Sequence, residues 1–131
     1  MSQPYEAQQA LDKAKDCLDD AAYNLKGGRT IVCVNRCYYS FYYCLCCLLY
    51  LEDITAKTHK GVQQKFNEVF VKTNRFPVYT AKWISDAFNL RQFGDYDLEA
   101  VIPENDAQQL LQQGMSFHQM THRYFEDFIR R

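Results

Sequence analysis

The chain has 131 residues, the length of one domain, with 47% apolar and 24% charged residues. This balance is typical of a globular protein with one buried core and excludes a disordered chain. A net charge of −1 excludes a protein that coats nucleic acid through a broad basic surface, although it allows a local basic site.

The first predicted helix runs from Ala7 to Leu25, because its apolar residues recur at steps of three and four. Gly27 and Gly28 then end it. No early segment has the charged, apolar and small-residue layout of a signal peptide, so we expect a cytoplasmic protein.

The second helix is predicted from Arg29–Thr30 to about Leu51 and is apolar on nearly every side. We therefore expect it to be the most buried element. Its apolar run, Tyr38–Leu51, is 14 residues long, which is too short to span a bilayer, so we expect no membrane segment.

Six cysteines raise the alternative of a metal site. Cys33 and Cys37 are four residues apart and Cys44 and Cys47 are three apart, but both pairs lie in one helix whose faces diverge. We therefore expect buried thiols in a reducing compartment, with no metal and no cofactor.

Thr58 is a suitable N-cap for a third helix from His59 to about Lys72, and the segment Asn74–Pro77 breaks the chain after it. No strand-like alternation or repeat occurs anywhere in the sequence.

A fourth helix is predicted from about Thr80 to Phe93, with Gly94 fraying its end and Asp95–Ile102 forming a loop. Pro103 suits the first turn of a last helix. The prediction is one all-α domain over residues 1–131, a bundle of about five helices.

The hexapeptide from Arg91 to Tyr96 places a cation, an acid and a phenol close together. It could bind a phosphate group. Alternatively, Arg91 and Asp95 form an ordinary ion pair on a helix surface and Tyr96 packs at the end of the bundle.

Three segments in this order resemble the HEPN (higher eukaryotes and prokaryotes nucleotide-binding) domain family: Asn35–Tyr43, His59–Val62 with Phe66, and Arg91–Tyr96. The resemblance covers nearly the whole chain. It implies an antiparallel helical bundle that forms a homodimer. Many such proteins are encoded beside a small nucleotidyltransferase, with which they act as a toxin–antitoxin pair.

Catalytically active members carry an arginine, a polar residue and, a few positions later, a histidine, and they cleave RNA without a metal. Arg91 matches the arginine, Gln92 replaces the usual Asn or Asp, and Tyr96 stands near the position of the histidine. A tyrosine has an ordinary pKa near 10 and is a poor general base at neutral pH. The resemblance therefore implies a non-catalytic or weakly catalytic module.

The family pattern also has a histidine at the position of His59, which could line the same cleft as Arg91 and act on a proton. The alternative, which we favour, is a histidine that hydrogen-bonds between helices. Arg36 is a further candidate ligand residue beside Arg91, Asp95 and Tyr96.

The second helix is rich in tyrosine. An aromatic face with few cations is more typical of a protein interface than of base stacking, and we expect it to form the dimer interface. The predicted interface residues are Tyr38, Tyr39, Tyr42 and Tyr43.

A basic edge follows the third helix, and whether it converges with Arg36 and Arg91 stays open. Its members are Lys57, His59, Lys60, Lys65, Lys72, Arg75 and Lys82.

Three functions are therefore compatible with the sequence. The first is a module that binds a nucleotide, RNA or a partner protein. The second is a metal-independent endoribonuclease toxin in which Arg91 contacts phosphate and Tyr96 or His59 moves the proton. The third is a purely structural dimeric adaptor.

Overall fold

The structure is a computed structural model that describes residues 2–131, with side chains from residue 4 onward. All its regular elements are helical, and the all-α prediction is confirmed. The elements are α1 (Ser2–Lys26), α2 (Thr30–Leu51), α3 (His59–Phe66), a π-helical turn η1 (Asn67–Val71), α4 (Val78–Tyr96) and α5 (Glu104–Ile129).

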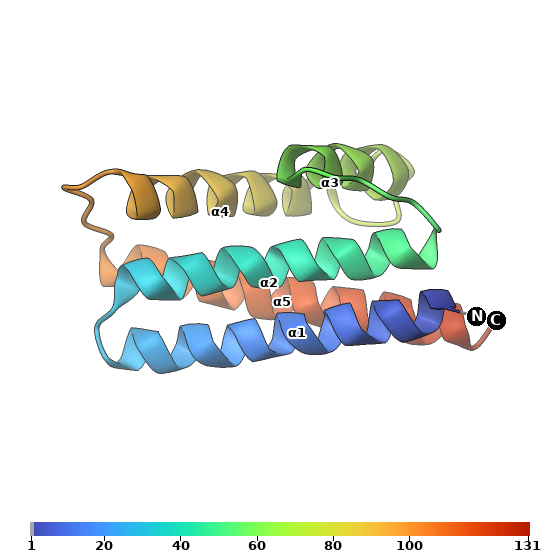
Figure 1. Ribbon diagram of the computed structural model, residues 1–131, viewed down its shortest axis with the longest axis horizontal. Helices are drawn as coiled ribbons and strands as arrows, with labels where there is room; N and C mark the ends of the chain where they lie inside the picture. Colours follow the sequence, from blue (N-terminus) through green and yellow to red (C-terminus); the bar gives the residue numbers. More distant parts are fainter. Residues whose placement is uncertain (1) are drawn as a thin grey trace.

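Each long helix runs antiparallel to the long helix before it, so α1 and α4 point one way, α2 and α5 point the other way, and α2 lies at the centre (Figure 1). Helix α1 lies along one side of α2, α3 and α4 lie end to end along the other side, and α5 lies behind. The two chain ends meet at one end of the bundle. Because α2 contacts every other α-helix, more than half of its residues are buried, as its apolar sequence predicts.

By length and composition, α2 is also the one described helix that could cross a membrane. At 22 residues it is longer than the apolar run that we used to exclude a span. The same length and composition occur in core helices of bundles, which is the place that α2 takes here.

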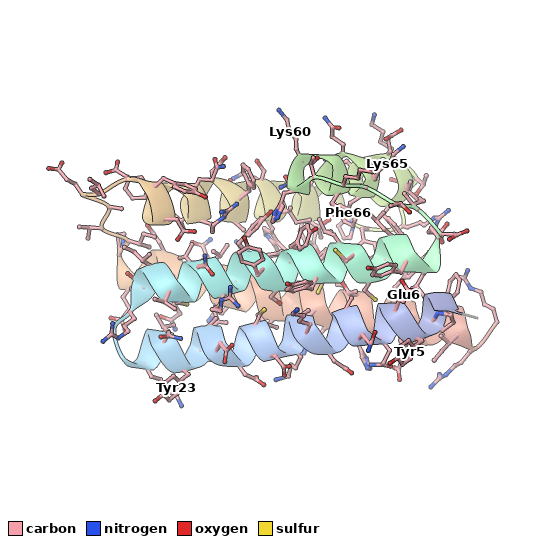
Figure 2. The ribbon with its side chains drawn as sticks, in the orientation of Figure 1. Tyr5, Glu6, Tyr23, Lys60, Lys65 and Phe66 are labelled. Carbon is pink, nitrogen blue, oxygen red and sulfur yellow. The ribbon has the colours of Figure 1, made fainter. Side chains whose placement is uncertain are left out.

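Aromatic rings fill the core where α2, α3 and α5 meet. Phe117 of α5 lies 5.4 Å from Phe41 and 5.7 Å from Phe66, between ring centres. Figure 2 shows Phe66 pointing from α3 toward α2. Phe70 and Phe76 extend this cluster toward the start of α4. Such tilted and edge-to-face contacts add stability beyond the area that they bury.

Three helical segments end in the same way, with a residue in the left-handed conformation. Gly28, Asp53 and Asn74 have φ of 76°, 56° and 64°. In each case the following amide donates to a carbonyl five residues back, for example Arg29 N–H to Asn24 O at 2.9 Å. This is the Schellman arrangement, in which glycine is favoured. The predicted stop at Gly27–Gly28 is therefore confirmed.

The third predicted helix begins as expected, because the Thr58 side chain accepts a hydrogen bond from Gly61 N–H at 2.9 Å. It does not continue regularly to Lys72. The π-helical turn η1 follows Phe66, and Lys72 N–H donates to the carbonyl of Asn67, five residues back. The Schellman motif at Asn74 then ends this segment.

The fourth helix does not fray at Gly94 but continues to Tyr96, which shortens the predicted loop. A side chain at Gly94 would place Cβ 3.1 Å from Ile102 Cδ1 and 3.3 Å from Ile31 Cγ2. The glycine therefore lets α4 approach the start of α2 and the α4–α5 connection closely, and it does not act as a helix stop.

Gly28 and Gly27 provide a matched test of the first helix end. We expect Gly28→Ala to lower the free energy of unfolding by about 1 kcal/mol, because a Cβ disfavours positive φ. No atom lies within 4 Å of that Cβ, so the loss would come from the backbone alone. Gly27→Ala meets only an ordinary 3.6 Å contact and should change stability by less than about 0.5 kcal/mol. Equal losses in urea denaturation of both variants would contradict this assignment.

Candidate functional site

Arg91 is the one charged side chain that is buried among the described residues, with 8% of its surface exposed. It belongs to the inward stripe of α4 and faces α2. Its guanidinium carbon lies 4.8 Å from the centre of the Tyr38 ring, 5.6 Å from that of Phe88 and 5.7 Å from that of Tyr39. Three aromatic faces therefore stabilise the cation electrostatically.

The charge of Arg91 is only partly compensated. Its one carboxylate partner, Asp95, is four residues on, with NH1 and Oδ2 3.8 Å apart, beyond hydrogen-bond distance. The buried Nε of Arg91 has no hydrogen-bond partner. A buried cation without full pairing is costly, so this arrangement needs a reason beyond packing.

Asn35 of α2 connects this arginine to a second one. Its amide donates to Asp95 Oδ2 at 3.0 Å, and its carbonyl oxygen accepts from Arg36 at 2.8 and 3.1 Å. The Arg36 guanidinium lies 5.2 Å from the centre of the Tyr39 ring. Arg36, Asp95 and Arg91, three of the four predicted ligand residues, thus form one network.

Sequence reasoning did not select Asn35 as a site residue. The available signal was a polar pair, Asn35 and Arg36, within an otherwise apolar helix. Only the packing of α4 beside α2 shows that the amide faces Asp95.

His59, at the start of α3, lies in the same cluster. Its Nδ1 is hydrogen-bonded to the hydroxyl of Tyr38, the residue whose ring contacts Arg91, and its ring stacks on Tyr42 at 4.3 Å. Burial and the nearby Arg91 charge lower the pKa of His59 below its ordinary value. The histidine therefore both bonds between helices, as we favoured, and stands beside Arg91. We call Arg91, Asp95, Asn35, Arg36, Tyr38 and His59 the Arg91 cluster.

Tyr96 does not join the Arg91 cluster within the chain. Because α4 stays helical, a residue five positions on is rotated by about 140° around its axis. Tyr96 is 71% exposed and borders an open hollow at the end of α4 with Gln92, Phe93 and Leu98.

The four predicted interface tyrosines differ in exposure. Tyr38 is 1% exposed and belongs to the core of its own subunit, where burial raises its pKa to about 12. Tyr39, Tyr42 and Tyr43 are half-buried. They belong to a solvent-facing stripe between α1 and α3–α4, the α2 face, which consists of Asn35, Arg36, Tyr39, Tyr42, Tyr43, Cys46 and Tyr50.

Of the predicted basic edge, His59 lies in the Arg91 cluster, whereas several of the other members are engaged elsewhere. Lys65, Arg75 and Lys82 form ion pairs with Glu68, Glu52 and Asp86, at 3.6, 3.2 and 2.8 Å. Figure 2 shows Lys60 pointing outward from α3, away from α2.

All six cysteines are free thiols, and five of them are buried. Burial raises the pKa of Cys47 to about 12 and that of Cys46 to about 11, so these thiols stay protonated at neutral pH. Across the part of the chain that the structure describes, no group of three or more His, Cys, Asp or Glu could hold a metal ion. His118 instead bonds to the carbonyl of Leu11 at 3.2 Å.

Comparisons with known proteins agree on one family. The profile of the HEPN domain matches residues 7–124. A protein of Methanocaldococcus jannaschii named "Putative toxin MJ0142" is 36% identical over 91% of this chain and 81% of its own length. A "UPF0332 protein" of Thermotoga maritima is 31% identical over 90% of this chain and 89% of its own, and one of Gloeobacter violaceus is 30% identical over 87% and 86%.

The lowered pKa of His59 predicts a stability that depends on pH. Between this pKa and the unfolded value of about 6.5, the unfolded state binds more protons, so the free energy of unfolding should rise with pH and fall on acidification. His118, whose pKa burial also lowers, acts in the same direction.

Urea unfolding at pH 7 and pH 5 measures this effect. His59→Gln should reduce the difference between the two pH values, and adding His118→Gln should reduce it further. An NMR titration of the His59 ring should give a midpoint below 6.5. An unchanged pH dependence in His59→Gln would contradict the assignment.

Proposed function

Since the chain belongs to the HEPN family, we propose that it is the toxin-like member of a toxin–antitoxin pair and that its Arg91 cluster binds a phosphate group of RNA or of a nucleotide. A nucleotidyltransferase is the proposed partner. The toxin name of the Methanocaldococcus jannaschii relative supports the first part, because that protein matches nearly the whole chain.

The observation that carries the phosphate proposal is the incomplete pairing of Arg91. Its guanidinium is buried against three aromatic rings, its carboxylate neighbour is 3.8 Å away, and its Nε has no partner. Asp95 neutralises one of the two guanidinium groups of the cluster, so an anion bound here would balance the other one, Arg36, and would give Arg91 the acceptor that Asp95 does not reach. Guanidinium groups bind phosphate oxygens through strong charge-assisted hydrogen bonds.

Arg36 and His59 complete the proposed site. Arg36 is tied through Asn35 to Asp95 and adds a second guanidinium beside Tyr39. The lowered pKa keeps His59 neutral at pH 7, and Tyr38 engages its Nδ1, which leaves Nε2 for a ligand. Because Tyr96 lies elsewhere on α4, we propose a module that binds, with weak catalysis or none.

A second candidate, metal-independent RNA cleavage, is supported by the position of His59 beside Arg91. A ribose 2′-oxygen would attack the adjacent phosphorus and lose its proton to a neutral His59. The bond to the 5′-oxygen would break, and that oxygen would take up a proton. Arg91 would stabilise the negative charge on the phosphate.

We further propose that the α2 face forms a homodimer interface. Tyr39, Tyr42 and Tyr43 are half-buried with polar tips, which is typical of interface residues. Two Arg91 clusters would then border one shared cleft, as the family pattern implies. A structural adaptor would form the same dimer but bind no nucleotide or RNA.

RNA binding tests the phosphate proposal. In EDTA, a labelled single-stranded RNA should bind the protein, and Arg91→Ala should weaken binding by tenfold or more, because a charged hydrogen-bonding partner is worth about 1.5 kcal/mol or more. Lys82→Ala is the matched control, since Lys82 also pairs with an aspartate four residues on in α4 but is 76% exposed.

The outcome of that experiment also separates the candidates. Cleavage products that disappear in both Arg91→Ala and His59→Ala would establish the ribonuclease. Binding without cleavage supports the module. No binding to RNA, and no rise in melting temperature with nucleotides, would leave the adaptor and refute the phosphate site.

Mass measurement by light scattering tests the interface. The protein should elute as a dimer, and Tyr42→Glu should shift it to the monomer, because a buried unpaired carboxylate destabilises an interface. Tyr23→Glu is the control: Tyr23 is 79% exposed and points away from α2 on the outer side of α1 (Figure 2). A Tyr42→Glu protein that remains dimeric would contradict an interface on the α2 face.

A further inference from the structure

A second hollow lies away from the Arg91 cluster and shares no residue with it. It occupies about 500 Å³ between the second half of α5 and the turn that leads into α4. This volume is within the range of sites for small molecules. Its wall combines apolar and charged side chains: Arg75, Phe76, Pro77, Ser116, Gln119, Met120, Arg123, Tyr124 and Asp127.

The apolar floor of this hollow is fixed in place. Phe76 is only 4% exposed, and the Tyr124 ring lies 5.9 Å from it, between ring centres. The Tyr124 hydroxyl donates to Glu52 Oε2 at 3.3 Å and accepts from Arg75 NH1 at 3.2 Å. Met120 completes the floor with a polarizable side chain that favours contact with aromatic rings. A flat ligand would therefore meet a surface that needs little reorganisation.

The charges around the hollow are unequal. Arg75 is compensated by Glu52 at 3.2 Å. Arg123 is exposed and has no ion pair, side-chain hydrogen bond or aromatic contact with any residue that the structure describes. Asp127, one turn further along α5, is also unpaired within those residues and would repel a ligand with several negative charges.

We propose that this hollow binds a small aromatic anion: a flat ring system on Phe76, Met120 and Tyr124, with a single carboxylate or sulfonate group on Arg123. The pairing of one apolar surface with a wall cation that has no ion pair defines this ligand class, and the Arg131 guanidinium, 6.0 Å from the centre of the Tyr124 ring, adds a second positive charge nearby. The site is separate from the proposed function of the Arg91 cluster.

The methionines provide a local probe. In protein labelled with [methyl-¹³C]methionine, naphthalene-1-sulfonate should shift the Met120 signal, because the ring would lie against that methyl group. Met115 is on the same helix and 50% exposed, but it lies outside the hollow and should not shift. Met120→Leu assigns the signal. A ligand of this size should bind with a Kd on the order of 1 mM.

Two comparisons decide the outcome. Arg123→Gln should weaken the binding of naphthalene-1-sulfonate about fivefold, and Arg91→Ala should leave it unchanged. A failure of this site can therefore be distinguished from a failure of the Arg91 cluster. 1-Naphthylmethylammonium, which carries the same ring with the opposite charge, should bind more weakly than the sulfonate.

Other results would overturn the proposal. They are equal binding of the two naphthalene compounds, equal shifts of Met115 and Met120, or no effect of Arg123→Gln, each of which indicates non-specific adsorption. A Met120 shift with inorganic phosphate as large as that with the sulfonate would show that no ring is needed.

Discussion

The contact between the Arg91 guanidinium and the Tyr38 ring is the interaction on which the rest of the site depends. It joins α4 to α2, and the Tyr38 hydroxyl joins both to His59 at the start of α3. A cation at this place is tolerated because three ring faces and one distant carboxylate share its stabilisation. The polar residues Asn35 and Arg36 then interrupt an otherwise apolar α2 because they complete this arrangement.

The bundle presents two surfaces of different chemistry. The α2 face combines half-buried tyrosines with the Arg91 cluster along one side. Its other side borders α1 in a hollow whose charged lining is three acidic residues, Glu6, Asp12 and Asp16, and one basic residue, Lys13. A polyanion on this face would be attracted at one edge and repelled at the other, so the net charge of −1 is compatible with a local phosphate site. The hollow beside α5 lies apart from both.

The helices could be predicted from the sequence because their apolar stripes repeat at steps of three and four. The end of the first helix at Gly28 could also be predicted, since a glycine pair directly after an apolar stripe is enough to indicate a helix end. The role of Gly94 could not be predicted, because it depends on Ile31 and Ile102, which approach it from distant parts of the chain. The end of α4 decides where Tyr96 points, and this helix end, which places Tyr96 apart from Arg91, could not be predicted from the sequence. The family pattern predicted that His59 could lie beside Arg91. The role of Asn35 could not be predicted, because it depends on how α4 packs beside α2.

The burial of Arg91 has a consequence for how the protein would respond to salt. Mobile ions screen exposed charges within about 10 Å at moderate ionic strength but reach a buried guanidinium poorly. A ligand held mainly by Arg91 and Arg36 neutralises about two phosphates, so the logarithm of its affinity should fall with a slope of about −1.4 for a single strand. Proteins that hold RNA through a broad basic surface lose affinity far more steeply. The bundle would therefore recognise one short stretch of the RNA backbone. Its affinity for that stretch would depend only weakly on the salt concentration.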